Sequence, residues 1–151
     1  MKNFIFVIGI CAVIFSLGIC ACKSKSSTKS GGNVVSEKLF DKKWKLTEIN
    51  GVALSTMNPQ PAVEVFIIFQ TGENRVHGNN GCNNFTGKYK IGQGNSLSFS
   101  GMASTRMMCI DMTTENQMNK MFQAVDKYVI AGNTLSLNQG ETVLAKFVLN
   151  E

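Results

Sequence analysis

The sequence contains one histidine and two prolines among its 151 residues, and these scarcities exclude several kinds of chemistry. No serine–histidine–aspartate set, pair of catalytic carboxylates or phosphate-binding loop can be assembled from the residues present. A zinc site would need four ligands, and no C-x-x-C spacing supports one. We therefore predict that the protein is not an enzyme, and that it uses no metal and no cofactor.

Net positive charge is also scarce once the N-terminal region is separated from the rest. The chain has 15 basic and 10 acidic residues, but four of the basic ones are Lys2, Lys23, Lys25 and Lys29. From Asn33 onward, 11 basic residues stand against 10 acidic ones. A domain this close to neutral has no electrostatic footprint for nucleic acid, so we expect no nucleic-acid partner.

The N-terminus, MKNFIFVIGICAVIFSLGICAC, has one basic residue and then an uncharged run from Phe4 to Ala21. As a helix, this run would nearly span a bilayer core of about 30 Å, so a transmembrane anchor is one interpretation. Its short length and its small residues at the end instead favour a secretory signal peptide over residues 1–21.

The end of this run, ICAC, resembles a bacterial lipobox. Cys22 fits the lipidated position better than Cys20, which would place the bulky Ile19 at the cleavage site. Residues 23–33 have no apolar side chain, so residues 22–33 are predicted to be a lipidated cysteine and a flexible tether. The position after Cys22 holds Lys23, whereas an aspartate there would resemble an inner-membrane retention signal. The tether also lacks the acidic cluster that resembles a surface-export signal. We therefore expect a lipid anchor in the outer membrane, facing the periplasm.

Residues 34–151 are enough for one domain with its own core. Alternating apolar residues, separated by turn-forming ones, predict a series of short strands. They cover residues 43–50, 63–70, 75–78, 85–91, 97–100, 128–131, 135–138 and 142–149.

One segment has the periodicity of a helix. An apolar stripe with spacing i, i+3, i+4, i+7 is formed by Met118, Met121, Phe122 and Val125. Residues 113–117 before it offer a hydroxyl N-cap. Asp111 and Glu115 are expected to decorate the start of the helix, where negative charge is favourable.

These elements predict a mainly β fold of the α+β class. Short strands at regular spacing are typical of an antiparallel meander that closes toward a small barrel. A helix with one apolar stripe has one face to bury, so we expect it to pack across that sheet.

Several motifs in this region resemble the META domain, the HslJ-like family of small envelope lipoproteins and stress-linked proteins. They are Trp44-Lys45-Leu46, the GCNNFTGKY of residues 81–89, the ASTRMMC of residues 103–109, and Leu135-Ser136-Leu137. The resemblance covers essentially the whole predicted domain. It implies a β-rich fold with one helix and a link to envelope stress, and it implies no reaction.

Two cysteines, Cys82 and Cys109, lie beyond the leader. An even pair in an exported domain is typical of a disulfide, and closing a loop of about 28 residues would contribute roughly 3.5 kcal/mol. The surrounding asparagines and glycines, including Gly78 and Gly81, would permit the turn backbone that this junction needs.

Two other interpretations of these cysteines stay open. His77 lies shortly before Cys82 and could act as its base in nucleophilic catalysis, although no orienting residue can be assigned. Six methionines lie between residues 102 and 121, beside Cys109, and soft sulfur ligands select Cu(I). Methionine also fills irregular cores, so the same cluster fits a purely structural role.

The junction between the two cysteine segments is the predicted functional face. Its candidate binding residues are Asn83, Asn84, Thr105 and Arg106, all expected at the surface. Arg106 could pair with Asp111, cap nearby carbonyl groups or present a ligand-binding fork.

Two classes of function fit this sequence. The first is a monomeric, lipid-anchored, non-enzymatic protein that binds another envelope protein and supports stress tolerance. The second is a binder of a small apolar ligand inside an incompletely filled barrel. A ligand binder needs a cavity, whereas a filled core with an exposed patch favours a protein partner.

Overall fold

The structure, a computed structural model, describes residues 38–150. The predicted signal peptide, the lipidation site Cys22 and the tether lie outside these residues. Within the described range, no helix is both long enough and apolar enough to cross a bilayer.

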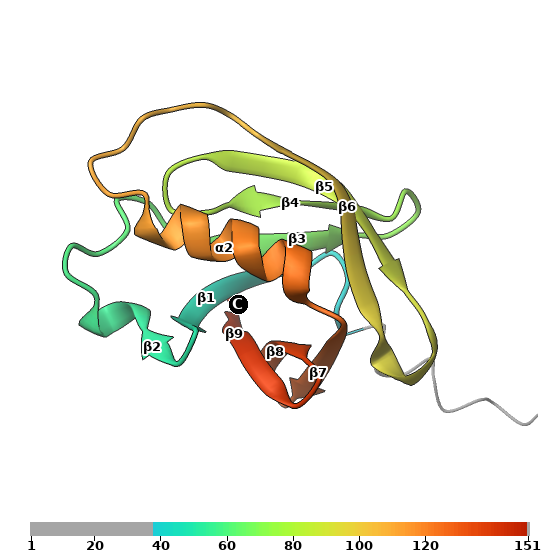
Figure 1. Ribbon diagram of the computed structural model, residues 1–151. Coiled ribbons are helices and arrows are strands. Elements are labelled where there is room, and N and C mark those ends of the chain that lie inside the picture. The colour runs from blue at the N-terminus through green and yellow to red at the C-terminus, as the bar shows by residue number, and fades with distance from the viewer. Residues whose placement is uncertain (1–37, 151) are drawn as a thin grey trace, which may run out of the picture.

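The described chain forms one antiparallel sheet with a single α-helix against it (Figure 1). The strands are β1 (Lys43–Ile49), β2 (Val52–Ala53), β3 (Phe66–Gln70), β4 (Arg75–Asn79), β5 (Asn84–Ile91), β6 (Leu97–Ser104), β7 (Lys127–Ala131), β8 (Thr134–Gln139) and β9 (Thr142–Leu149). The helix is α2 (Thr113–Ala124), and two short 3-10 turns are η1 (Leu54–Thr56) and η2 (Gln93–Asn95).

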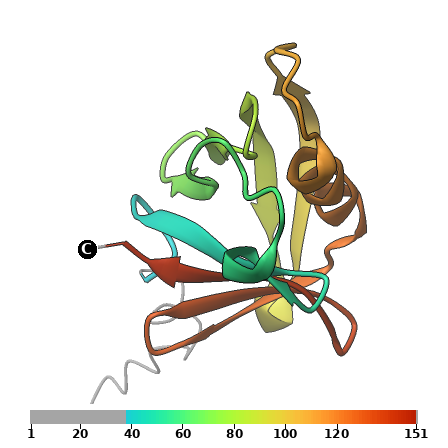
Figure 2. The ribbon, with the colours of Figure 1, turned by 90° about the vertical axis from the view of Figure 1, so that its left-hand side faces the viewer.

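The sheet consists of two meanders that are joined through β1. The strand order is β6-β5-β4-β3-β1-β9-β8-β7, and β2 pairs with the end of β1. The sheet curls into a half-barrel with the helix at its opening (Figure 2). The predicted mainly β meander with one packed helix is therefore confirmed.

The two edge strands, β6 and β7, meet only where each begins. The Leu97 amide donates to the Asp126 carbonyl at 2.8 Å, and Ser96 forms a bridge with Lys127. Along the rest of its length, β6 pairs only with β5 among the described residues. The half-barrel is therefore open on one side, and α2 covers this opening.

The core lies between the concave face of the sheet and α2. The predicted helical stripe is confirmed, because Met118, Met121, Phe122 and Val125 are all buried. In β1 the buried positions are Trp44, Leu46 and Ile49, and a bulge between Leu46 and Glu48 explains the change in spacing from two to three. Each large apolar side chain buried in this way stabilises the fold by about 1.5–3 kcal/mol.

Two predicted strand boundaries were wrong. β3 begins at Phe66 rather than at residue 63, and Glu64 before it forms ion pairs with Lys43 and Lys45 of β1. Hydrogen bonds from Lys43 and Lys45 lower the pKa of Glu64. β6 continues to Ser104 rather than ending at residue 100. A bulge opposite residues 86–88, with Gly101 at φ 58°, resets the alternation that the sequence pattern relies on.

Candidate functional site

A disulfide joins the two cysteine segments at one end of the sheet. Cys82 is bonded to Cys109, with their Cα atoms 5.9 Å apart and 27 positions apart in sequence, so the predicted pairing is confirmed. Cys82 lies in the loop of residues 80–83 between β4 and β5, called here the asparagine loop. Cys109 lies in residues 105–112 between β6 and α2, called here the connecting loop.

The asparagine loop is shaped by its own side chains. The Asn80 side-chain oxygen accepts hydrogen bonds from the backbone amides of Cys82 at 3.3 Å and Asn83 at 2.7 Å. The Asn79 side-chain oxygen accepts one from the Gly81 amide at 2.8 Å. Gly81 has a φ of 102°, in the region that L side chains rarely adopt. The predicted turn backbone is thus found at Gly81, whereas Gly78 lies inside β4 and its φ is not positive, so the prediction that Gly78 shapes the turn was wrong.

Asn83 connects this loop to the connecting loop. Its side-chain amide donates to the Met107 carbonyl at 3.1 Å, and its side-chain oxygen accepts from the Met107 amide at 2.7 Å. The same oxygen accepts from the Thr105 hydroxyl at 2.6 Å. Asn83 is only 1% exposed, so the prediction that it is a surface residue was wrong. The Asn83 side chain thus bonds to the Met107 backbone in both directions, as a neighbouring strand would.

Glu115 ties the start of α2 to the same asparagine. Its carboxylate accepts a hydrogen bond from the Asn83 side-chain amide at 2.8 Å, and the residue is buried. Glu115 lies in the first turn of the helix, as expected, but its burial and its bond to Asn83 were not predicted. A buried carboxylate needs such a donor, because an unpaired one costs several kcal/mol.

The N-terminus of α2 is capped differently from the prediction. The N-cap residue is Met112, which makes no side-chain capping bond. Asp111 acts instead, because its carboxylate accepts from the Thr113 hydroxyl at 2.6 Å and from the Thr113 amide at 3.0 Å. Both bonds lower the pKa of Asp111, and the bond from the Thr113 hydroxyl has the larger effect. Asp111 is thus engaged within its own turn.

The other predicted binding residues do lie at the surface of the junction. Asn84 is exposed, and its side-chain oxygen accepts from the Asn79 side-chain amide at 3.0 Å. Thr105 is exposed, and its amide donates to the Asn84 carbonyl at 3.0 Å. Arg106 is exposed and forms no ion pair or side-chain hydrogen bond within residues 38–150, so the suggested Asp111 pair is not formed. Their assignment as binding residues stays a prediction.

The connecting loop exposes three apolar side chains. Met107 is 59% exposed, and Met108 and Ile110 are essentially fully exposed, at 99% and 108%. Sequence reasoning counted the methionines as possible metal ligands or core residues and did not identify Ile110. The absence of a strand or helix pattern around residues 107–110 was the available signal for exposure.

His77 and Cys82 do not form a catalytic pair in this arrangement. His77 sits in the middle of β4, opposite Ile68 of β3 and Thr86 of β5, on the face away from the buried Val76. Cys82 is held in the disulfide and supplies no thiolate. The same oxidation leaves Cys109 without a thiolate for Cu(I).

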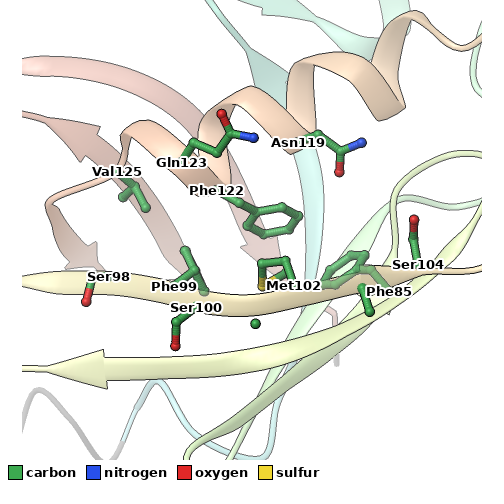
Figure 3. A pocket seen from close by; sticks show the side chains of 12 residues that line it. Phe85, Ser98, Phe99, Ser100, Met102, Ser104, Asn119, Phe122, Gln123 and Val125 are labelled. Atoms are coloured by element: carbon green, nitrogen blue, oxygen red, sulfur yellow. The ribbon is translucent and has the colours of Figure 1, made fainter.

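A groove of about 490 Å³ runs between β6 and α2 (Figure 3). The buried rings of Phe85 and Phe122 pack against each other at its floor, with centroids 4.9 Å apart, and Asn119 and Gln123 project from the helix. Every residue that lines this groove is uncharged. The barrel interior proper is filled by the packed core side chains. This groove lies along the free edge of the sheet, and a second hollow of about 480 Å³ lies between β1 and residues 60–65.

The family model described as "META domain" matches residues 37–151. The chain belongs to the META-domain family. The motifs that carried the resemblance, around Trp44, Cys82 and Cys109, now have structural roles in the core and at the junction.

Solved structures with the same fold include two from named bacteria. A structure described as the NMR structure of the protein from Burkholderia xenovorans is 20% identical, with a TM-score of 0.60, covering 77% of this META domain's chain and 86% of that chain. A DUF4847 family protein from Bacteroides vulgatus is 15% identical, with a TM-score of 0.56, covering 77% and 97%. Another NMR structure is 24% identical, with a TM-score of 0.57, covering 76% and 95%. At these identities they show the shared fold. No curated protein matches the chain significantly.

The disulfide predicts how the purified domain behaves toward thiol reagents. Its intact mass should be lower by two hydrogens before reduction, and neither Cys82 nor Cys109 should react with a thiol-labelling reagent. Replacing both by serine should lower the free energy of unfolding by roughly 3.5 kcal/mol, measured by urea denaturation. Full labelling of both cysteines without reductant would contradict the pairing.

Asn83 and Asn84 provide a matched pair for the junction. Asn83→Ala should lower the free energy of unfolding by about 2–4 kcal/mol, because it leaves the Met107 backbone and the Glu115 carboxylate without their partner. Asn84→Ala should cost less than about 1 kcal/mol, because its side chain is exposed. Urea denaturation of both variants measures this difference, and equal losses would contradict the role given to Asn83.

Proposed function

We propose that this protein is a lipid-anchored, non-enzymatic envelope protein that binds another envelope protein through its connecting loop. The lipid anchor rests on the ICAC motif that ends at Cys22, and the periplasmic address rests on the residues after it. The link to stress tolerance rests on the resemblance to the HslJ-like stress-linked members of the family. Binding through the loop rests on the geometry of the junction.

The exposure of Met107, Met108 and Ile110 is the observation that carries this proposal. Three neighbouring apolar side chains in one loop leave water-exposed surface that a partner would cover, with a gain of about 25 cal/mol per Å² buried. Exposed apolar patches of this kind mark sites of protein interaction. Methionine adapts its shape to a partner and is common at such surfaces.

The loop is held in place before any partner binds. The disulfide attaches it at Cys109, and the Asn83 side chain pairs with the Met107 backbone in both directions. A loop ordered in advance loses less conformational entropy on binding, which favours affinity.

The position of the loop also suits an anchored protein. The described chain starts beside the end of β3, where Thr71 bonds to Asp41 and the Asp41 amide donates to the Phe69 carbonyl. The asparagine loop follows β4 at the opposite end of the β3–β4 pair, where Phe66 is aligned with Asn79. A tether that enters at one end would therefore leave the connecting loop at the far end (Figure 1).

The alternative functions find less support. A small-ligand binder requires space inside the barrel, whereas packed side chains fill the interior and the groove along β6 is open. A Cu(I) site would have to use thioether ligands alone, because Cys109 is oxidised. Nucleophilic catalysis lacks a free thiol for the same reason.

The loop can be tested without disturbing the fold. Joint replacement of Met108 and Ile110 by serine should abolish chemical crosslinking of the full-length protein to its partner in intact cells, and should reduce survival under envelope stress. Thermal unfolding should be unchanged, because exposed substitutions alter stability by less than about 0.5 kcal/mol. Val129→Ser, at an exposed apolar position on β7, is the control and should retain the crosslinked species. Identical crosslinking in the wild type, the double variant and Val129→Ser would contradict the assignment of the loop as the binding surface.

The anchor has its own matched pair of cysteines. Cys22→Ser should abolish lipidation, so that the intact mass carries no acyl chains, whether the protein is released or stays in the membrane as an uncleaved precursor. Cys20→Ser should leave the protein lipidated and in the membrane fraction, which fractionation and intact mass together measure. Lipidation that persists in Cys22→Ser and disappears in Cys20→Ser would contradict the choice of Cys22.

A further inference from the structure

β6 is an edge strand whose outer backbone groups are mostly unpaired. Its first residue, Leu97, directs its amide outward to the Asp126 carbonyl, away from β5. The backbone N–H and C=O groups of successive residues point to opposite sides of a strand, so those of Phe99 point to the same outer side as those of Leu97. Among residues 38–150, no strand lies there to receive it.

The far end of β6 also directs polar groups outward. The Thr105 amide donates to the Asn84 carbonyl at 3.0 Å, which flanks the aligned pair of Phe85 and Ser104. In an antiparallel ladder, a pair flanked by such bonds does not exchange bonds itself. The amide and carbonyl of Ser104 therefore point away from β5, toward the free edge.

The groove described above lies against this free edge. Its floor includes Phe99, Met102 and Phe122, and its helix wall carries the side-chain amides of Asn119 and Gln123 (Figure 3). The edge thus offers backbone hydrogen bonds on one side of the groove, apolar surface below and amide groups opposite. These are the features that an added β-strand uses for recognition.

We propose that this edge binds an extended, uncharged segment of a protein partner as an additional strand beside β6. The proposal rests on the proposed function in one respect, since it identifies which part of the partner is recognised. Backbone groups of the segment pair with those of Phe99 and Ser104. Every second side chain of the segment enters the groove and contacts its aromatic floor.

Charge decides the chemistry of this segment. Every side chain that lines the groove is uncharged, so an ionised side chain placed there would lose water without gaining a counter-ion. An uncharged segment with alternating small apolar and hydroxyl side chains is complementary. Since Ser104 leads directly into the connecting loop at Thr105, a strand along β6 would extend the contact toward Met107.

Ser104 allows the backbone contribution to be tested by itself. Ser104→Pro removes the outward amide without removing a bond to β5, and proline is tolerated on the free side of an edge strand. Ser104→Ala is the matched control, because it keeps the amide and loses only the hydroxyl. The probe is an acetylated and amidated heptapeptide of sequence Thr-Val-Ser-Val-Thr-Val-Ser. A second peptide carries aspartate in place of each valine.

Titration of the isotope-labelled domain with the first peptide should shift the amide resonances of residues 98–104 and 119–123. Ser104→Ala should bind with unchanged affinity, whereas Ser104→Pro should bind at least about tenfold more weakly, and the aspartate peptide should not bind. If Ser104→Pro does not retain its fold by thermal unfolding, Ser104→Lys takes its place. That variant keeps the amide and places a charge in the neutral groove, and should likewise lose the peptide.

Four results would overturn the proposal. The first is equal binding by the Ser104→Ala and Ser104→Pro proteins. The second is the absence of any shift in residues 98–104 up to the solubility of the peptide. The third is a concentration-dependent dimer that Ser104→Pro abolishes, which would assign the edge to a second copy of the chain. The fourth is a shift of these resonances by octanol and not by peptide, which would assign the groove to a small apolar ligand.

The cellular crosslinking experiment separates this inference from the proposed function. If Met108→Ser with Ile110→Ser abolishes crosslinking and Ser104→Pro does not, the loop binds the partner and the added strand is wrong. If none of these variants changes the crosslinked species, both are wrong. If the crosslinked species is lost in the double variant and in Ser104→Pro but kept in Ser104→Ala, the loop assignment and the added strand are both supported.

Discussion

The bond between the Asn83 side chain and the Met107 backbone is the interaction on which the junction depends. The connecting loop belongs to neither β6 nor α2, so its backbone groups need partners from elsewhere. One asparagine amide supplies both a donor and an acceptor to Met107, and its second donor hydrogen reaches Glu115. The disulfide limits how far the loop can move, whereas Asn83 determines how its backbone is oriented. The exposed methionines have a defined position for this reason.

The same network determines where the helix sits. The start of α2 is tied to the asparagine loop through Glu115, and the residue after its C-cap, Asp126, accepts the Leu97 amide of β6. The helix is therefore attached at both ends to the β5–β6 side of the sheet. Its separation from β6 is fixed along its length, so the groove exists in the isolated domain.

Most of the fold could be predicted from sequence, because apolar and polar residues alternate over most of each strand and α2 carries a single apolar stripe. The disulfide could be predicted because only two cysteines were left to pair. The burial of Asn83 could not, because asparagine in a turn-rich segment is usually exposed. Its partners Met107 and Glu115 lie 24 and 32 positions away, and only the folded chain brings them together. β6 was predicted too short because a bulge interrupts its alternation.

That bulge has a consequence for self-assembly. Unprotected edge strands can stack on copies of themselves and seed aggregates, which a straight and regular edge promotes. At Gly101 the outward-facing positions change from odd residues, such as Phe99, to even ones, such as Ser104. Two copies aligned edge to edge would match over only part of their length, whereas a short flexible peptide can bend to follow the irregularity. The bulge at Gly101 thus makes the edge poorly suited to fibril growth, while a short peptide could still pair with it.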